Sequence, residues 1–104
     1  MERMELLREI KARLATAYGP RLRGVVLYGS RARGDAQSDS DWDILVLLSG
    51  PIQLLRDIHI NTEALYPLVL QSGQVIDAQP ADESEYRAQR SAWHRNVRSE
   101  GIEI

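Results

Sequence analysis

The stretch from Gly24 to Leu48 reads GVVLYGSRARGDAQSDSDWDILVLL and determines the fold that we expect. Its first residues, GVVLY, are mostly β-branched or aromatic and run directly into Gly29-Ser30, which is typical of a buried strand that ends in a tight turn. After a polar stretch, Trp42 to Leu48 forms a nearly continuous apolar run, which predicts a second strand buried on both faces. Two buried strands joined by a polar loop therefore form the centre of the predicted sheet.

Helices are expected on both sides of this stretch along the chain. Apolar residues recur at helical spacing from Glu5 to Ala17, and Gly19-Pro20 then stops the helix. Proline is favoured at the first helical position, so Pro51 is expected to open a second helix that runs to about Tyr66 or Gln71.

The last third of the chain predicts one more strand and one more helix. Gln74 to Ala78 is delimited by Gly73 and Pro80 and is typical of a short strand. Asp82 and Glu85 form a pattern like a capping box, which predicts a helix through about Arg98. The closing residues 102–104 fit either a short edge strand or a frayed end. The fold class that we predict is α/β (α+β), with a small mixed sheet of three to four strands and helices packed mainly on one face.

Length and composition limit the classes of protein to consider. The 104 residues, 43% apolar and 27% charged, are typical of one soluble domain spanning 1–104 with no separate acceptor-binding domain. Cysteine is absent and the longest apolar run, Ile44 to Leu48, is far too short to span a bilayer, so we expect no thiolate metal site, no membrane association and a cytoplasmic location. The net charge of −2 gives no general attraction to nucleic acid.

Three aspartates are candidate metal ligands. Successive strand side chains alternate between faces, so Asp41 and Asp43 should project to one side and Trp42 to the other. Asp77 lies in the next predicted strand and can reach the same point if the strands are neighbours. Mg²⁺ commonly takes one or two carboxylates together with substrate phosphates. The alternative is an exposed acidic turn at Asp41 and Asp43 and a surface acid at Asp77.

Gly29 and Ser30 are candidate phosphate-binding residues. Glycine lets the backbone turn sharply and approach a ligand closely, and serine with the following amides can donate hydrogen bonds to phosphate. An antiparallel pairing of the two central strands would bring this turn beside Asp41 and Asp43. The alternative is that Gly29-Ser30 forms only a turn.

The residues from Gly24 to Asp77 resemble the minimal nucleotidyltransferases of the DNA polymerase β-like superfamily, which also contains the kanamycin nucleotidyltransferases. The resemblance rests on Gly29-Ser30, Asp41, Asp43 and Asp77. It implies that Ser30 contacts the triphosphate of ATP, that the first two acids bind two Mg²⁺ ions, and that Asp77 binds one ion and helps to activate an acceptor hydroxyl. Arg31 and Arg33 resemble the basic positions that often follow the Gly-Ser pair and would bind the nucleotide.

The resemblance also suggests what such a chain would do. Many family members are encoded beside a HEPN-domain toxin, and some adenylylate a tyrosine hydroxyl of it and so act as its antitoxin. Two other functions stay open: a module that masks a toxin without catalysis, and a small-molecule adenylyltransferase, for which a homodimer would have to build the acceptor pocket.

Overall fold

Four strands form one mixed sheet in the order β3-β2-β1-β4 in the computed structural model, which describes all residues from 1 to 104. Strand β1 pairs antiparallel with β2 and with β4, whereas β2 and β3 are parallel. A short 3₁₀ helix, 19–21, follows α1. The elements are α1 (Arg3–Tyr18), β1 (Leu22–Tyr28), α2 (Ser30–Arg33), β2 (Trp42–Leu48), α3 (Leu54–Ser72), β3 (Ile76–Asp82), α4 (Glu83–Arg87), α5 (Ala92–Glu100) and β4 (Ile102–Glu103).

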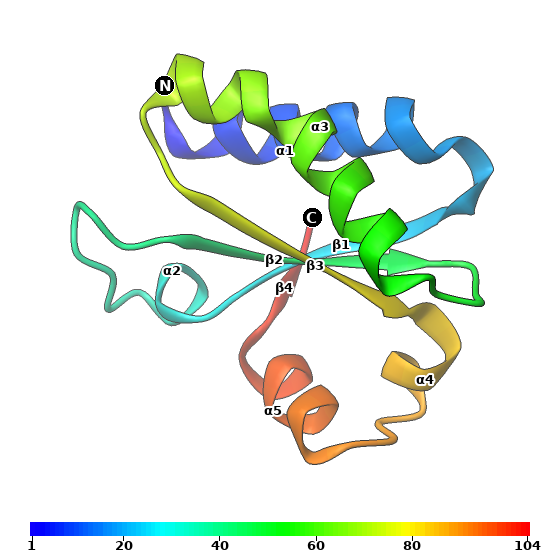
Figure 1. The fold of residues 1–104 in the computed structure, drawn as a ribbon. Helices are drawn as coiled ribbons and strands as arrows, with labels where there is room; N and C mark the ends of the chain where they lie inside the picture. Colours follow the sequence, from blue (N-terminus) through cyan, green and yellow to red (C-terminus); the bar gives the residue numbers. More distant parts are fainter.

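Helices cover both faces of the sheet (Figure 1). The two long helices, α1 and α3, lie on one face, and the short helices α4 and α5 lie on the other. Strand β2 separates the two layers of the core, and all its residues from Ile44 to Leu48 are fully buried, as the apolar run predicts. Side chains alternate along β2, so Ile44 and Val46 pack under α1 and α3 while Leu45 and Leu47 pack against α4 and α5. None of the helices combines the length and the apolar character needed to cross a membrane.

The predicted fold class is confirmed, and three differences from the predicted elements have a clear physical cause. The first is the start of α3, which begins at Leu54 rather than at Pro51. The Gln53 amide donates to a carboxylate oxygen of Asp57 at 3.0 Å, so a side chain one turn inside the helix caps its start. The carbonyl of Pro51 accepts a hydrogen bond from Arg21 at 3.1 Å. Pro51 therefore belongs to the turn before the helix.

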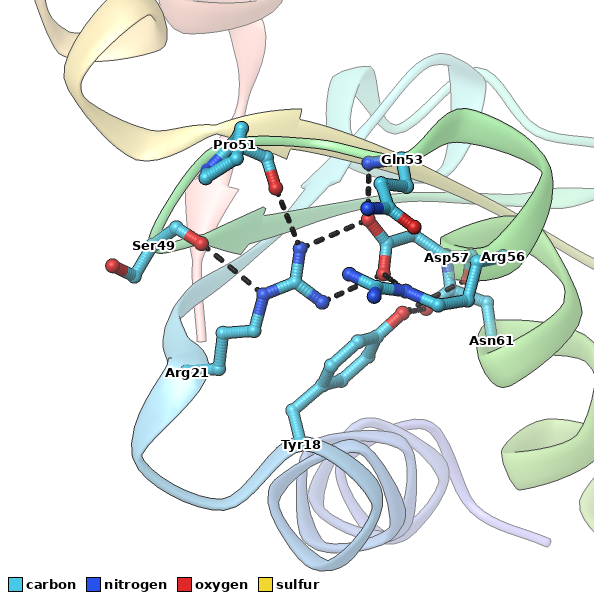
Figure 2. A network of polar contacts seen from close by, with 8 residues as sticks. All are labelled: Tyr18, Arg21, Ser49, Pro51, Gln53, Arg56, Asp57 and Asn61. Carbon is cyan, nitrogen blue, oxygen red and sulfur yellow. Dashed lines mark hydrogen bonds and ion pairs between the residues drawn. The ribbon is translucent and has the colours of Figure 1, made fainter.

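A buried polar network joins these segments (Figure 2). Arg21 donates to both carboxylate oxygens of Asp57, at 2.7 and 2.9 Å, and to the carbonyl of Ser49 at 3.2 Å. The Tyr18 hydroxyl donates to the Asp57 carbonyl at 2.9 Å or to Asn61 Oδ1 at 2.6 Å. Asp57 and Asn61 are the two polar residues of the chain with almost no exposed surface, at 0% and 1%. The network thereby fastens the end of α1 and the end of β2 to α3.

The second and third differences lie in the last third of the chain. Strand β3 begins at Ile76 and continues through Pro80, which was expected to end it. Proline is tolerated there because β3 is an edge strand and can leave one side of its backbone unpaired. Asp82 caps a helix as predicted, but Gln89 adopts a φ of 53° and Ser91 caps a new helix, so the one predicted helix is two, α4 and α5.

Candidate active site

The strand register brings two of the three predicted acids together. Asp43 is the partner of Tyr28 across the antiparallel β1–β2 pair and of Asp77 across the parallel β2–β3 pair. Trp42 and Ile44, on either side of Asp43, point into the core under α1 and α3. Asp43 and Asp77 therefore project side by side from the opposite face of the sheet, the one that α4 and α5 cover.

Asp41 completes a group of three negative charges. It is exposed and directly precedes β2. Burial raises the pKa of the Asp43 carboxyl above its usual range, and the charges of Asp77 and then Asp41 raise it further, whereas Arg33 lowers it. A set of carboxylate oxygens under mutual repulsion is the donor chemistry that suits Mg²⁺. No three side chains of the structure, however, are grouped closely enough to hold a metal ion by themselves.

The Gly29-Ser30 turn lies against this group. Gly29 has a φ of 73°, which other residues rarely adopt, and a Cβ atom there would overlap Asp43 Oδ2 and lie 3.1 Å from its Cγ. Glycine is required at this position because the backbone passes so close to the Asp43 carboxylate. Ser30 begins the short helix α2 and is half-buried, so its side chain is not sealed off from solvent.

Comparison with known proteins identifies the family. Residues 8–92 match the model of the polymerase β nucleotidyltransferase family. The chain belongs to this family and is a nucleotidyltransferase. A relative in Methanocaldococcus jannaschii, named "Putative protein adenylyltransferase MJ0604", is 32% identical over 102 residues, which are 97% of this chain and 96% of the relative. A second relative from that organism, named "Putative protein adenylyltransferase MJ0141", is 42% identical over 48 residues, 46% of this chain and 48% of the relative.

Solved structures share the fold. A putative nucleotidyltransferase from Sulfolobus solfataricus superimposes with a TM-score of 0.69 at 24% identity, over 96% of this chain and 77% of its own. A chain of a toxin–antitoxin crystal structure with AMP-PNP gives a TM-score of 0.63 at 20% identity, over 90% of this chain and 68% of its own. A chain of the toxin–antitoxin MntA-HpeT mutant D39ED41E gives a TM-score of 0.62 at 17% identity, over 99% of this chain and 72% of its own.

Replacement of Gly29 by alanine is expected to lower nucleotidyl transfer by about two orders of magnitude. The new Cβ must displace the Asp43 carboxylate, and a shift of roughly 1 Å in a reacting group can cost on the order of 100-fold in rate. The φ of Gly29 adds backbone strain of about 1 to 3 kcal/mol. Steady-state rates of transfer to an acceptor, together with urea denaturation, measure the two effects separately.

Gly34→Ala is the matched control. Gly34 has a φ of 88°, and a Cβ there would meet nothing within 4 Å. This variant should lose about 1 to 2 kcal/mol of stability through strain and keep its activity. Equal rates in the two alanine variants would show that the clash with Asp43 does not matter.

The two predicted arginines lie in different surroundings. Arg33 is exposed and pairs with Glu100 at 3.1 Å and with Asp35 at 3.2 Å, beside the acids of the site. Arg31 instead donates to the carbonyl of Ser40 at 2.8 Å and lies 4.5 Å from the ring of Trp42. Arg31 thus holds the loop before β2, and nucleotide binding by either arginine remains a prediction.

Three further side chains of the site were not identified from the sequence. Glu100 accepts a hydrogen bond from the Gly29 amide at 3.1 Å, although 71 residues separate the two. Tyr28 lies next to Asp43, and burial, followed by the charges of Asp43, Asp77 and Glu100, raises its pKa to about 12. Trp93 packs edge-to-face on Tyr28. Of these, only Tyr28 had a local signal, its place immediately before the Gly-Ser pair.

Proposed function

We propose that this nucleotidyltransferase transfers AMP from ATP to a hydroxyl group of a protein partner, in a reaction that depends on Mg²⁺. The observation that carries the proposal is the register pairing of Asp43 with Asp77 on the face where Gly29 adjoins Asp43. The family supports the reaction class, and two relatives named as protein adenylyltransferases support a protein acceptor.

Each residue of the site has a role in this proposal. Asp41, Asp43 and Asp77 would hold two Mg²⁺ ions, and Ser30 and Arg33 would bind the phosphates. Bound Mg²⁺ would offset negative charge on the triphosphate. The acceptor oxygen forms a bond to the α-phosphorus, the bond from that phosphorus to the bridging oxygen of the β-phosphate breaks, and pyrophosphate leaves. Asp77 accepts the proton of the acceptor hydroxyl.

The acceptor that we propose is a tyrosine of a HEPN-domain toxin, which would make the chain an antitoxin. Solved structures with this fold come from toxin–antitoxin assemblies. The chain matches 96% of the length of a relative named as a protein adenylyltransferase, so a domain of this size is shared with it. Asp77 is exposed, so the hydroxyl of a protein acceptor has access to it.

The second candidate function is masking of a toxin without catalysis. It is favoured by the solved toxin–antitoxin assemblies that share this fold, because masking needs only contact with the toxin. Masking requires the partner surface of the fold but no transfer of AMP. The two functions therefore predict different products.

Co-expression with the protein encoded beside it distinguishes these candidates. We expect the intact mass of the partner to increase by one or more AMP groups and peptide mapping to locate them on tyrosine. Omission of Mg²⁺ from a reconstituted reaction should abolish the increase. A tight complex whose partner keeps its unmodified mass would establish masking and contradict the transferase proposal.

A further inference from the structure

Helix α5 runs from the Gly29 turn to an exposed aromatic ring. Trp93, Val97 and Glu100 occupy positions i, i+4 and i+7 and so share one side of the helix. Val97 is buried against the sheet, and Glu100 contacts Gly29. Trp93 packs on Tyr28 of β1, so all three residues contact β1 or the turn after it. Figure 1 shows α5 on the same face of the sheet as α4.

Of the three residues on this side of α5, Trp93 is the one that is exposed to solvent. Its side lies toward the sheet, yet the residue keeps 44% of its surface exposed, whereas Val97 keeps 2%. The ring of Trp93 packs against two other rings, with centroid distances and interplanar angles of 6.0 Å and 88° to Tyr28 and of 5.6 Å and 52° to His94. An aromatic side chain that is fixed by neighbours but open to solvent is suited to stacking on a planar ligand.

Its neighbour Tyr28 links this ring to the acids. Tyr28 is the strand partner of Asp43, so both side chains project from the same face of the sheet. The ring of Trp93 therefore lies next to the residue that adjoins the candidate metal ligands. Along α5, seven residues separate Trp93 from Glu100, which corresponds to roughly 10 Å at the helical rise. If the phosphates of a nucleotide bind at Gly29, its ribose and base extend away from that turn, over a distance comparable to the one that separates Glu100 from Trp93.

We propose that the exposed face of Trp93 is the platform on which the base of the bound nucleotide stacks. The proposal rests on the proposed function, because it requires a nucleoside triphosphate with its phosphates at the Gly29-Ser30 turn. Stacking on one aromatic ring changes affinity by about tenfold to a hundredfold and tolerates different bases. Purines, with the larger ring system, should therefore bind more tightly than pyrimidines.

Calorimetric titration of two ligands in the presence of Mg²⁺ tests this proposal. Inorganic tripolyphosphate serves as a ligand without a base and ATP as a ligand with one. Trp93→Ala should weaken ATP binding by about tenfold or more and leave tripolyphosphate binding unchanged. Trp93→Phe should restore most of the ATP affinity because it keeps an aromatic face. The protein has two tryptophans, and Trp42 is buried. Quenching of the tryptophan fluorescence by ATP but not by tripolyphosphate should therefore report stacking on Trp93.

Other outcomes overturn the proposal in recognisable ways. Equal weakening of both ligands by Trp93→Ala would mean that the residue acts through the packing of α5. Unchanged ATP affinity with slower transfer would assign Trp93 to the acceptor instead of the base. In both cases the proposed function stands. If the parent protein binds neither ligand, the proposed function fails and the stacking proposal fails with it.

Discussion

The double variant Asp41→Asn, Asp43→Asn is expected, under the proposed function, to lose all Mg²⁺-dependent ATP binding and all adenylyl transfer. Each asparagine keeps the size of the side chain and removes one negative charge, so the changes isolate the electrostatic role of the site. The remaining acid, Asp77, is exposed and accepts a hydrogen bond from Gln79 at 2.8 Å. One such carboxylate cannot replace three in offsetting the charge of a divalent ion.

Folding should not suffer from this double change. The raised pKa of Asp43 means that the folded state binds a proton more tightly than the unfolded chain does. Ionised Asp43 therefore opposes folding, and this unfavourable contribution of Asp43 to stability is relieved as the pH falls through its raised pKa. Asparagine removes the ionised form, so the variant should be as stable as the parent at neutral pH or slightly more stable. Loss of binding without loss of stability is the signature of a functional site.

Thermal denaturation with ATP, with and without Mg²⁺, measures both effects at once. A ligand at 100 times its Kd adds about 2.7 kcal/mol of stability. For a domain of this size each kcal/mol raises Tm by about 4 to 8 °C, so the shift of the parent should be large. The control is Asp39→Asn with Glu63→Gln, which removes two exposed charges outside the site and should keep the shift. A Mg²⁺-dependent shift in the site variant equal to that of this control would remove Asp41 and Asp43 from the metal site.

Local pattern sufficed for the centre of this fold. Strand β2 has the predicted bounds, Trp42–Leu48, because a nearly continuous apolar run is stable only when it is buried on both faces of a sheet, and polar residues precede and follow it. The alternation of faces along that strand then fixed the sides on which Trp42 and Asp43 lie. The placement of Asp43 and Gly29 could be predicted because it depends on this strand and on the turn before it, and Asp77 joins them because β3 is the neighbour of β2.

Contacts between distant segments account for what the sequence alone did not indicate. Pro51 was a reasonable first residue for a helix, but Arg21 binds its carbonyl and Asp57 caps the chain two residues further on. Glu100 reaches Gly29 only because β4 returns the chain to β1. Arg31 follows the Gly-Ser pair but lies against Trp42, a neighbour that the β1–β2 hairpin supplies. Such partners are set by the tertiary fold, and no spacing along the chain encodes them.

Asp57→Ala is expected to destabilise the protein by about 3 to 5 kcal/mol, the range for removal of one member of a buried ion pair. The Asp57 side chain has 0% of its surface exposed, and that of Arg21 has 25%. In this variant the Arg21 guanidinium loses two hydrogen bonds, and the Gln53 amide loses the carboxylate oxygen that accepts its hydrogen bond (Figure 2). The backbone carbonyl that accepts from Tyr18 is unchanged, so the loss is attributable to the carboxylate.

Arg56→Ala provides the comparison for this buried pair. Arg56 lies 3.8 Å from the same carboxylate, but 51% of its side chain is exposed, and surface ion pairs contribute about 0 to 1 kcal/mol. Urea denaturation at neutral pH should therefore show a large loss for Asp57→Ala and a small one for Arg56→Ala. Similar losses in the two variants would mean that burial does not determine the strength of the Asp57 interactions.

The pH dependence gives an independent test of the same carboxylate. The hydrogen bond from Arg21 is the main cause that holds the pKa of Asp57 below its usual range. The stability that ionised Asp57 contributes is therefore complete above the pKa of this carboxyl in the unfolded chain, about 3.9. It is lost as the pH falls through the lower pKa of the folded protein. The stability difference between the parent and Asp57→Ala should be constant from pH 7 to about pH 5 and should shrink in stronger acid. A difference that stays constant down to pH 2 would mean that folding does not lower the pKa of Asp57.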